Sequence, residues 1–324
     1  MSWWRLWQRT NELAERVLNS RASWHPSTSR GPGRKIVTGR PTNFDPALKH
    51  FGRGLVAADP RLASAEQLAA WHARQRDVMA HVLRAIAQSE WAPHLVLRGS
   101  ALMRTWFGDA ARPPKDLDFV VVPESLDIDD PQASRLLEGI VDEVLARPCP
   151  GVELLRREVA SDDIWTYDRV PGTRLVFRWT ADELPWGATQ LDFVFGETLP
   201  VPAESVDVQL DQGPPARLAA ASKALSLAWK LLWLVSDTYP RGKDLYDAML
   251  LAEAVKLPRE LLDEVFTIAN EVPPRSLKWY PWGRTENRPD GCSELEWVGF
   301  EERDERTVEE WKTRLSQALA DSED

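Results

Sequence analysis

Cysteine is scarce in this chain, which has only Cys149 and Cys292 among its 324 residues. Two cysteines cannot form the disulfide framework of a small secreted domain, and a reduced compartment is the default for such a chain. Long apolar runs are lacking as well. The most apolar segment, residues 224–235, is too short to span a bilayer and contains Lys230. Because the N-terminal residues also lack an apolar core of signal-peptide length, the sequence predicts a soluble, cytoplasmic protein without a membrane segment.

An excess of positive charge is absent, because 50 Asp and Glu residues against 40 Lys and Arg residues give a formal net charge of −10. This balance excludes a protein that is coated in positive charge. The distribution is uneven, since residues 1–60 contain ten Lys or Arg and only four Asp or Glu. A basic extension on an acidic body is compatible with a local phosphate-binding patch. We expect this extension to be an arm or linker that is either solvated or in contact with RNA or a partner protein.

The chain is organised around residues 95–122, which read as a strand, a small-residue turn, a short helix, a polar loop and a second strand. Gly99 and Ser100 form the turn, and Asp116 and Asp118 open the second strand. Successive side chains of a strand face opposite sides, so the two carboxylates are expected on one face. They repel each other unless a cation lies between them, and Mg²⁺ takes oxygen ligands of this kind together with substrate phosphates.

The other end of the same stretch suits an anion. Gly99 allows the backbone to approach a ligand closely. The N–H groups at the start of the following helix point toward such a ligand and favour negative charge. With one end suited to phosphate and the other to a metal ion, the stretch indicates transfer of a group from a nucleoside triphosphate.

Hydrophobic spacing predicts the elements on either side. A helix should begin near Ser64, which forms a capping box with Gln67, and another should run from Pro131 to Arg147. Two strands, over residues 174–179 and 189–195, are expected to form an antiparallel hairpin. After a boundary loop at 200–215, only helices are expected, over residues 216–237, 243–256, 258–271 and 305–320, with an irregular connection at 272–304. A further helix is expected at residues 1–22.

Several of these apolar elements carry charged residues. Asp192 lies in the second predicted strand, where a buried carboxylate is costly unless it is paired or metal-bound, although at a sheet edge it would be solvated. Lys230 interrupts an apolar helix and shares its face with Lys223; its ammonium either reaches solvent or binds a triphosphate. Asp244 and Asp247 share adjoining surface on the next helix. Asp244 either stabilises the first turn of that helix or pairs with Lys230.

Together these segments resemble the AbiEii/AbiGii-type nucleotidyltransferase toxins, which include the mycobacterial MenT toxins and fall within the DNA polymerase β-type nucleotidyltransferase superfamily. The resemblance covers residues 90–255. It is carried by Gly99-Ser100, by Asp116-x-Asp118, by Lys230 and by the segment RGKDLYD from Arg241 to Asp247. The first two motifs alone are moderately specific, and their combination with the other two is considerably more so.

The resemblance implies an α+β fold, with a small mixed sheet flanked by helices. We expect a basic extension at residues 1–61, a nucleotidyltransferase domain at 62–204 and a helical domain at 205–324 that completes the active-site cleft. The implied site residues are, by role, catalytic Asp116, Asp118, Lys230 and Asp244; metal-binding Asp116, Asp118 and Asp192; NTP-binding Gly99, Ser100, Lys230, Arg241 and Lys243; and, as second choices, Lys223 and Asp247. The implied cofactor is Mg²⁺ or Mn²⁺, and a nucleoside triphosphate is the implied substrate.

The implied function is transfer of a nucleoside monophosphate to an acceptor hydroxyl. The family resemblance points to a tRNA 3′ end as acceptor, to translation arrest as the result and to an antitoxin encoded nearby as partner. A small molecule such as an aminoglycoside and a partner protein remain alternative acceptors. A non-catalytic binding module is disfavoured, because it would have no reason to keep costly paired carboxylates. The oligomeric state and the preferred nucleotide do not follow from the sequence.

Overall fold

The computed structural model describes residues 42–44, 55–57, 59–62, 64–166, 170–236, 241–277 and 305–323. The predicted helix at residues 1–22, most of the basic extension and most of the connection at 272–304 lie outside the described residues. Within the extension, β1 (Thr42–Phe44) and β2 (Leu55–Ala57) pair antiparallel as a separate two-stranded sheet.

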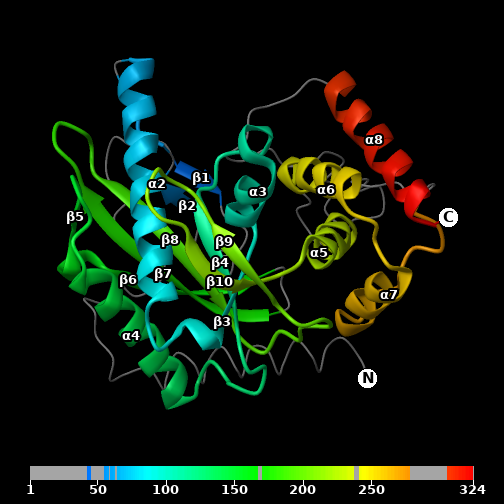
Figure 1. Ribbon diagram of the computed structural model, residues 1–324, viewed down its shortest axis with the longest axis horizontal. Helices are drawn as coiled ribbons and strands as arrows, with labels where there is room; N and C mark the ends of the chain where they lie inside the picture. The colour runs from blue at the N-terminus through cyan, green and yellow to red at the C-terminus, as the bar shows by residue number, and fades with distance from the viewer. Residues whose placement is uncertain are drawn as a thin grey trace.

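The centre of the molecule is an eight-stranded mixed sheet (Figure 1). Its strands are β3 (Leu95–Arg98), β4 (Asp116–Val121), β5 (Glu153–Leu154), β6 (Ala160–Thr166), β7 (Val170–Thr180), β8 (Gly187–Val194), β9 (Glu204–Val208) and β10 (Ala216–Ala220). The strand order is β5-β7-β8-β4-β3-β10-β9, with β6 paired to β7 off this path. β4 therefore lies inside the sheet, antiparallel to β3 and parallel to β8.

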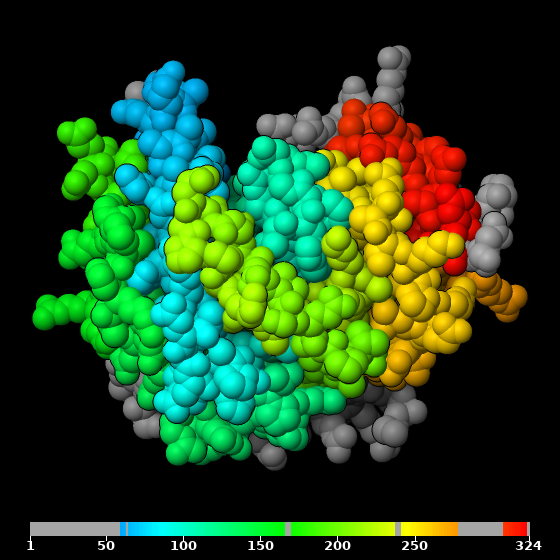
Figure 2. Space-filling model, in the orientation of Figure 1, coloured from blue at the N-terminus to red at the C-terminus, as the bar shows by residue number. Residues whose placement is uncertain are grey.

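Helices cover the sheet and extend beside it. They are α2 (Ala65–Ala87), α3 (Ser100–Phe107), α4 (Pro131–Ala146), α5 (Lys223–Ser236), α6 (Gly242–Ala254), α7 (Arg259–Ile268) and α8 (Glu305–Glu323). Figure 1 shows α2 and α4 running along the sheet, with α5, α6, α7 and α8 gathered to one side and α3 between the two groups. In the space-filling view the surface is hollowed between the upper end of α2 and α3, and it continues from α3 to α6 and α8 (Figure 2). None of the helices in the described ranges is long and apolar enough to cross a membrane.

The helices on the sheet follow from their sequences. The Ser64 hydroxyl accepts a hydrogen bond from the Gln67 backbone N–H at 3.2 Å, which confirms the predicted cap of α2. The Asp130 side chain caps α4 in the same way, accepting from the Gln132 N–H at 2.7 Å, and Pro131 follows as the first helical residue. Their apolar stripes are buried against the sheet and each other, so both predicted helices are confirmed.

The predicted hairpin is also confirmed, because β7 and β8 pair antiparallel. The prediction of helix from residue 216 was wrong for residues 216–220, which form β10. The segment ARLAA is alanine-rich and by propensity favours a helix. It instead pairs with β9 on one side and β3 on the other, and its burial alternates along the strand. Tertiary pairing overrides propensity here. The prediction of a loop at 200–215 was also wrong for residues 204–208, which form β9, so the sheet extends past the expected boundary between residues 204 and 205.

Candidate active site

Two aspartates of β4 share one face of the sheet, as predicted. Asp116 and Asp118 are half-buried, whereas Leu117 and Phe119 between and after them are fully buried. On the apolar face the Phe119 ring stacks on Phe193 of β8 with centroids 5.4 Å apart. Each such buried phenylalanine stabilises the fold by about 1.5–3 kcal/mol. This packing fixes the strand so that its carboxylates face away from the core.

The glycine–serine turn lies directly against these carboxylates. Gly99 has a φ of 82°, and a Cβ atom there would lie 2.3 Å from Oδ2 of Asp118, so only glycine fits. Ser100 begins α3, and its hydroxyl donates to Oδ1 of Asp116 at 3.2 Å. The structure thus brings together the two motifs that the sequence separates by sixteen residues.

Crowded negative charge perturbs Asp118. Burial, the Asp116 carboxylate and the Asp192 carboxylate raise the pKa of Asp118 to about 7, while Arg98 and Lys243 act in the opposite direction. At neutral pH this carboxyl group is therefore poised between its two protonation states. A cation between Asp116 and Asp118 would relieve the repulsion that raises the pKa.

Asp192 lies beside Asp118 in the β4–β8 register, as expected of a third carboxylate. It is buried in an interior strand, so the alternative of a solvated edge position was wrong. Both of its oxygens accept hydrogen bonds from the buried Arg174 of β7, from Nε and from Nη2, each at 2.7 Å. Across the ranges that the structure describes, no three Asp, Glu, His or Cys side chains converge in a way that could hold a metal ion.

Lys230 is buried on α5 and already has anionic partners. Its ammonium lies 2.6 Å from Oδ1 of Asp244 and 3.0 Å from Oδ2 of Asp247, both on α6. It also lies over the Trp233 ring, 5.0 Å from the centroid. The expected pairing of Lys230 with Asp244 is thus present. The ammonium does not reach solvent, because only 4% of the residue is exposed.

The ion pairs decide the protonation states of this group. Burial alone would lower the pKa of Lys230, but Asp244 and Asp247 outweigh it, so the pKa is raised. Burial would likewise raise the pKa of Asp244, but Lys230 and Lys243 bring it down to about 2. Lys230 and Asp244 are therefore both charged at neutral pH, and their charges compensate each other.

Arg112 is a member of this group that the sequence reasoning missed. It lies in the proline-containing loop before β4 and holds Asp247 through Nε at 3.3 Å and Nη2 at 3.1 Å from Oδ2. Burial opposes its charge, but Asp247 and Asp116 raise the pKa of Arg112 further. No helical or strand periodicity applies to a loop, so only the contact with α6 reveals this residue.

The two remaining lysines of the predicted site have different surroundings. Lys243, in the first turn of α6, is half-buried; burial and the nearby Arg241 and Arg112 lower its pKa, and Asp116 and Asp244 counteract them. Its ammonium forms no ion pair with another residue that the structure describes. Lys223 instead lies over the rings of Trp106 and Phe107, 5.9 and 5.8 Å from their centroids.

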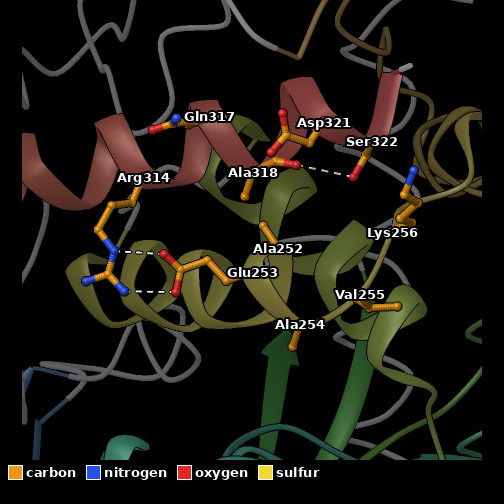
Figure 3. Close-up of a pocket in the computed structure, with 10 residues that line it drawn as sticks. All are labelled: Ala252, Glu253, Ala254, Val255, Lys256, Arg314, Gln317, Ala318, Asp321 and Ser322. Carbon is orange, nitrogen blue, oxygen red and sulfur yellow. Dashed lines mark hydrogen bonds and ion pairs between the residues drawn. The ribbon is translucent and has the colours of Figure 1, made fainter.

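A separate hollow of about 470 Å³ lies between the end of α6 and α8 (Figure 3). Arg314 pairs with Glu253 across it through two hydrogen bonds of 2.8 Å. Its lining comes from α6, α8 and the residues just after α6, and includes none of the predicted site residues.

The structure places paired strand carboxylates against a glycine–serine turn, next to a helical segment with a buried lysine, which is the arrangement expected of a nucleotidyltransferase. A family model described as nucleotidyl transferase AbiEii toxin, type IV TA system, matches residues 81–324. The chain belongs to this family of nucleotidyltransferase toxins of type IV toxin–antitoxin systems, which confirms the resemblance. The family implies a nucleoside triphosphate substrate and a cognate antitoxin.

The fold agrees with this assignment. The structure is similar to MenT4, a nucleotidyltransferase toxin from Mycobacterium tuberculosis H37Rv, with a TM-score of 0.51 and 18% sequence identity over 81% of this chain and 86% of that chain. At this identity the similarity concerns the fold alone. A comparison with curated proteins found no match.

Proposed function

We propose that this protein transfers a nucleoside monophosphate from a nucleoside triphosphate to an acceptor hydroxyl, at the face of β4. One observation carries the proposal: Asp116 and Asp118 lie together against the Gly99 turn, and the pKa of Asp118 is raised to about 7 by burial and by the neighbouring carboxylate. A fold gains nothing from such repulsion, so the arrangement favours a cationic ligand.

The triphosphate would lie between the turn and α6. Backbone N–H groups at the start of α3, next to Gly99 and Ser100, suit phosphate oxygens. Lys243 and Arg241 supply positive charge from α6, and the Lys243 ammonium has no other ion pair in the described part of the chain. Lys230 contacts two carboxylates already. In this proposal it reaches the phosphates less directly than Lys243 does.

Asp116 and Asp118 are the residues that would hold Mg²⁺ or Mn²⁺. Carboxylate oxygens are the ligands that these ions prefer, and two protein ligands plus substrate phosphates make a usual magnesium site. The bound ion would offset charge on the transferred phosphate. Asp192 is proposed as a third ligand, a role that requires its oxygens to be shared with or released by Arg174.

In the proposed reaction the acceptor oxygen attacks the α-phosphorus in line with the leaving group. A new phosphorus–oxygen bond forms, the bond from the α-phosphorus to the bridging oxygen breaks, and pyrophosphate leaves. Asp118 or Asp192 is proposed to take the proton of the acceptor hydroxyl. Lys243 and Arg241 would stabilise the negative charge that develops on the leaving pyrophosphate.

We further propose a tRNA 3′ end as the acceptor, translation arrest in the cytoplasm as the outcome, and inhibition by the cognate antitoxin. The support is family membership together with the basic charge of residues 1–60. A small molecule or a partner protein remains a second possible acceptor. The helical part of the chain, from α5 onward, is proposed to form the second domain that completes the cleft.

A label-transfer experiment tests the proposal. The protein is incubated with Mg²⁺, each α-labelled nucleoside triphosphate in turn and total tRNA, beside an Asp116→Asn variant that keeps the side-chain shape. We expect label on tRNA with the native protein and none with the variant. Nucleotide binding without labelled RNA would move the acceptor to a small molecule or protein. If neither the native protein nor the variant binds a nucleoside triphosphate, the proposed transferase function is overturned.

A further inference from the structure

The loop that leads into β4 is attached to α6 at two neighbouring positions. The Tyr246 hydroxyl donates to the Ala110 carbonyl at 2.7 Å. One residue further along α6, Asp247 accepts hydrogen bonds from Arg112. Arg112 precedes Asp116 by only four residues. This attachment therefore ties β4, which carries the carboxylates, to α6, whose Asp244 and Asp247 bind Lys230.

Four charges alternate through the buried interface where α5, α6 and the loop before β4 meet. In order of contact they are Arg112, Asp247, Lys230 and Asp244, with exposed fractions of 9%, 0%, 4% and 2%. A buried charge is tolerated when it is paired, so each member depends on its neighbours. The row holds two positive and two negative side chains and therefore carries no net charge.

One oxygen atom joins the two cations. Oδ2 of Asp247 lies 3.1 Å from Nη2 of Arg112 and 3.0 Å from the Lys230 ammonium. The guanidinium is planar and reaches this carboxylate through two of its nitrogens, so it fixes the position of the carboxylate. The position of the carboxylate in turn sets where the ammonium lies between Asp247 and Asp244.

We propose that Arg112 is a positioning residue for nucleotidyl transfer. It acts through Asp247, which it holds in place to orient Lys230. It does not contact the substrate. This inference rests on the proposed function, because it assumes that Lys230 contributes to the transfer reaction.

The test compares Arg112→Lys with Arg84→Lys as matched control. Arg112→Lys keeps the positive charge but loses the planar guanidinium that binds Asp247 through two nitrogens. Arg84 pairs with Asp211 through two hydrogen bonds of 2.9 Å, and neither residue belongs to the site. We expect Arg112→Lys to lower kcat by about 10- to 100-fold, because losing a contact that orients a functional side chain typically reduces the rate by this factor. The KM for the triphosphate should change by less than about threefold, since only an orienting contact is lost.

A double-mutant cycle separates positioning from general stabilisation of the fold. If Arg112 acts through Lys230, then Arg112→Lys should change kcat by less than about twofold in a Lys230→Arg background. If Arg112→Lys fails to fold, Asp247→Asn takes its place in the same cycle, with the same expectation. Arg84→Lys should leave kcat unchanged.

The outcomes separate this inference from the proposed function. An equal loss of kcat in both backgrounds, or an unchanged kcat with a lower melting temperature, would overturn the role of Arg112 and leave the transferase proposal intact. Absence of nucleotidyl transfer by the native protein would instead overturn the proposed function and, with it, the inference.

Discussion

The two halves of the candidate site treat charge in opposite ways. On β4, two carboxylates with Asp192 close by repel one another, and the pKa of Asp118 rises to about 7. Where α5, α6 and the loop before β4 meet, two cations and two carboxylates alternate, and the pKa of Asp244 falls to about 2. The difference indicates that the helical half is complete before a ligand binds. The strand half, in the proposed function, takes up a cation from outside the chain.

The largest effect should come from breaking the strand half. Asp116→Asn removes one carboxylate without changing the side-chain shape. We expect a loss of transfer rate of about 1,000-fold, because charge stabilisation at the reacting phosphate is a large catalytic contribution. Single-turnover kinetics with labelled triphosphate measure the rate, and circular dichroism checks the fold. A rate within about tenfold of the native value would contradict the assignment.

Breaking the helical half should affect stability as well as rate. Lys230→Met leaves Asp244 and Asp247 facing each other in a buried site. Losing one member of a buried pair costs about 3–5 kcal/mol, and we expect a rate loss of about 100-fold. Urea denaturation measures the free energy of unfolding. The control Lys312→Met removes a half-buried partner of the exposed Glu309 and should cost less than about 1 kcal/mol. Equal effects of the two variants would be evidence against a compensated buried group.

Gly99→Ala sharpens the comparison by displacing Asp118 without changing any charge. The new Cβ would lie 2.3 Å from Oδ2 of Asp118, and the alanine would have to adopt a φ of 82°. We expect a loss of about 1–3 kcal/mol in stability and a 10- to 100-fold loss in rate. The matched control is Gly196→Ala, where φ is 68° but no atom lies within 4 Å of the added Cβ. If Gly196→Ala lowered the rate as much as Gly99→Ala, backbone strain alone would explain the loss, and displacement of Asp118 would not be needed.

Asp118→Asn should stabilise the metal-free protein in a pH-dependent way. A carboxyl group whose pKa rises from 3.8 to about 7 on folding destabilises the fold when it ionises. The penalty is absent below about pH 4 and complete above about pH 7. We therefore expect the variant to gain about 1–3 kcal/mol at pH 8 and nothing at pH 4. Mg²⁺ should stabilise the native protein at pH 8 but not the variant; a pH-independent difference would count against the assignment.

The smallest effect is expected at Lys223. Its ammonium lies over aromatic rings of α3, so Lys223→Met should cost less than about 1 kcal/mol in stability and change the rate by about threefold at most. Steady-state kinetics measure this directly. If Lys223→Met lowered the rate as much as Lys230→Met, Lys223 rather than Lys230 would be assigned the role in transfer.

The sequence predicted the strand half well, because local patterns encode it. Alternation along Asp116–Phe119 places both carboxylates on one face, and Gly99 marks a close approach of backbone and side chain. The pairing of Lys230 with Asp244 was also anticipated. Long-range contacts were not. Arg112 in its loop and Arg174 on Asp192 depend on tertiary packing, and β10 was assigned to a helix because its propensity favours one.

The contrast between the two halves is tested most directly by titrating both carboxyl groups in one experiment. Carboxyl ¹³C NMR of the metal-free protein would follow Asp118 and Asp244 as the pH changes. The structure predicts that Asp118 titrates near pH 7 and that its titration midpoint falls when Mg²⁺ is added. It also predicts that Asp244 stays ionised down to about pH 2. Titration of Asp118 close to 3.8, unaffected by Mg²⁺ or by Asp116→Asn, would contradict the account.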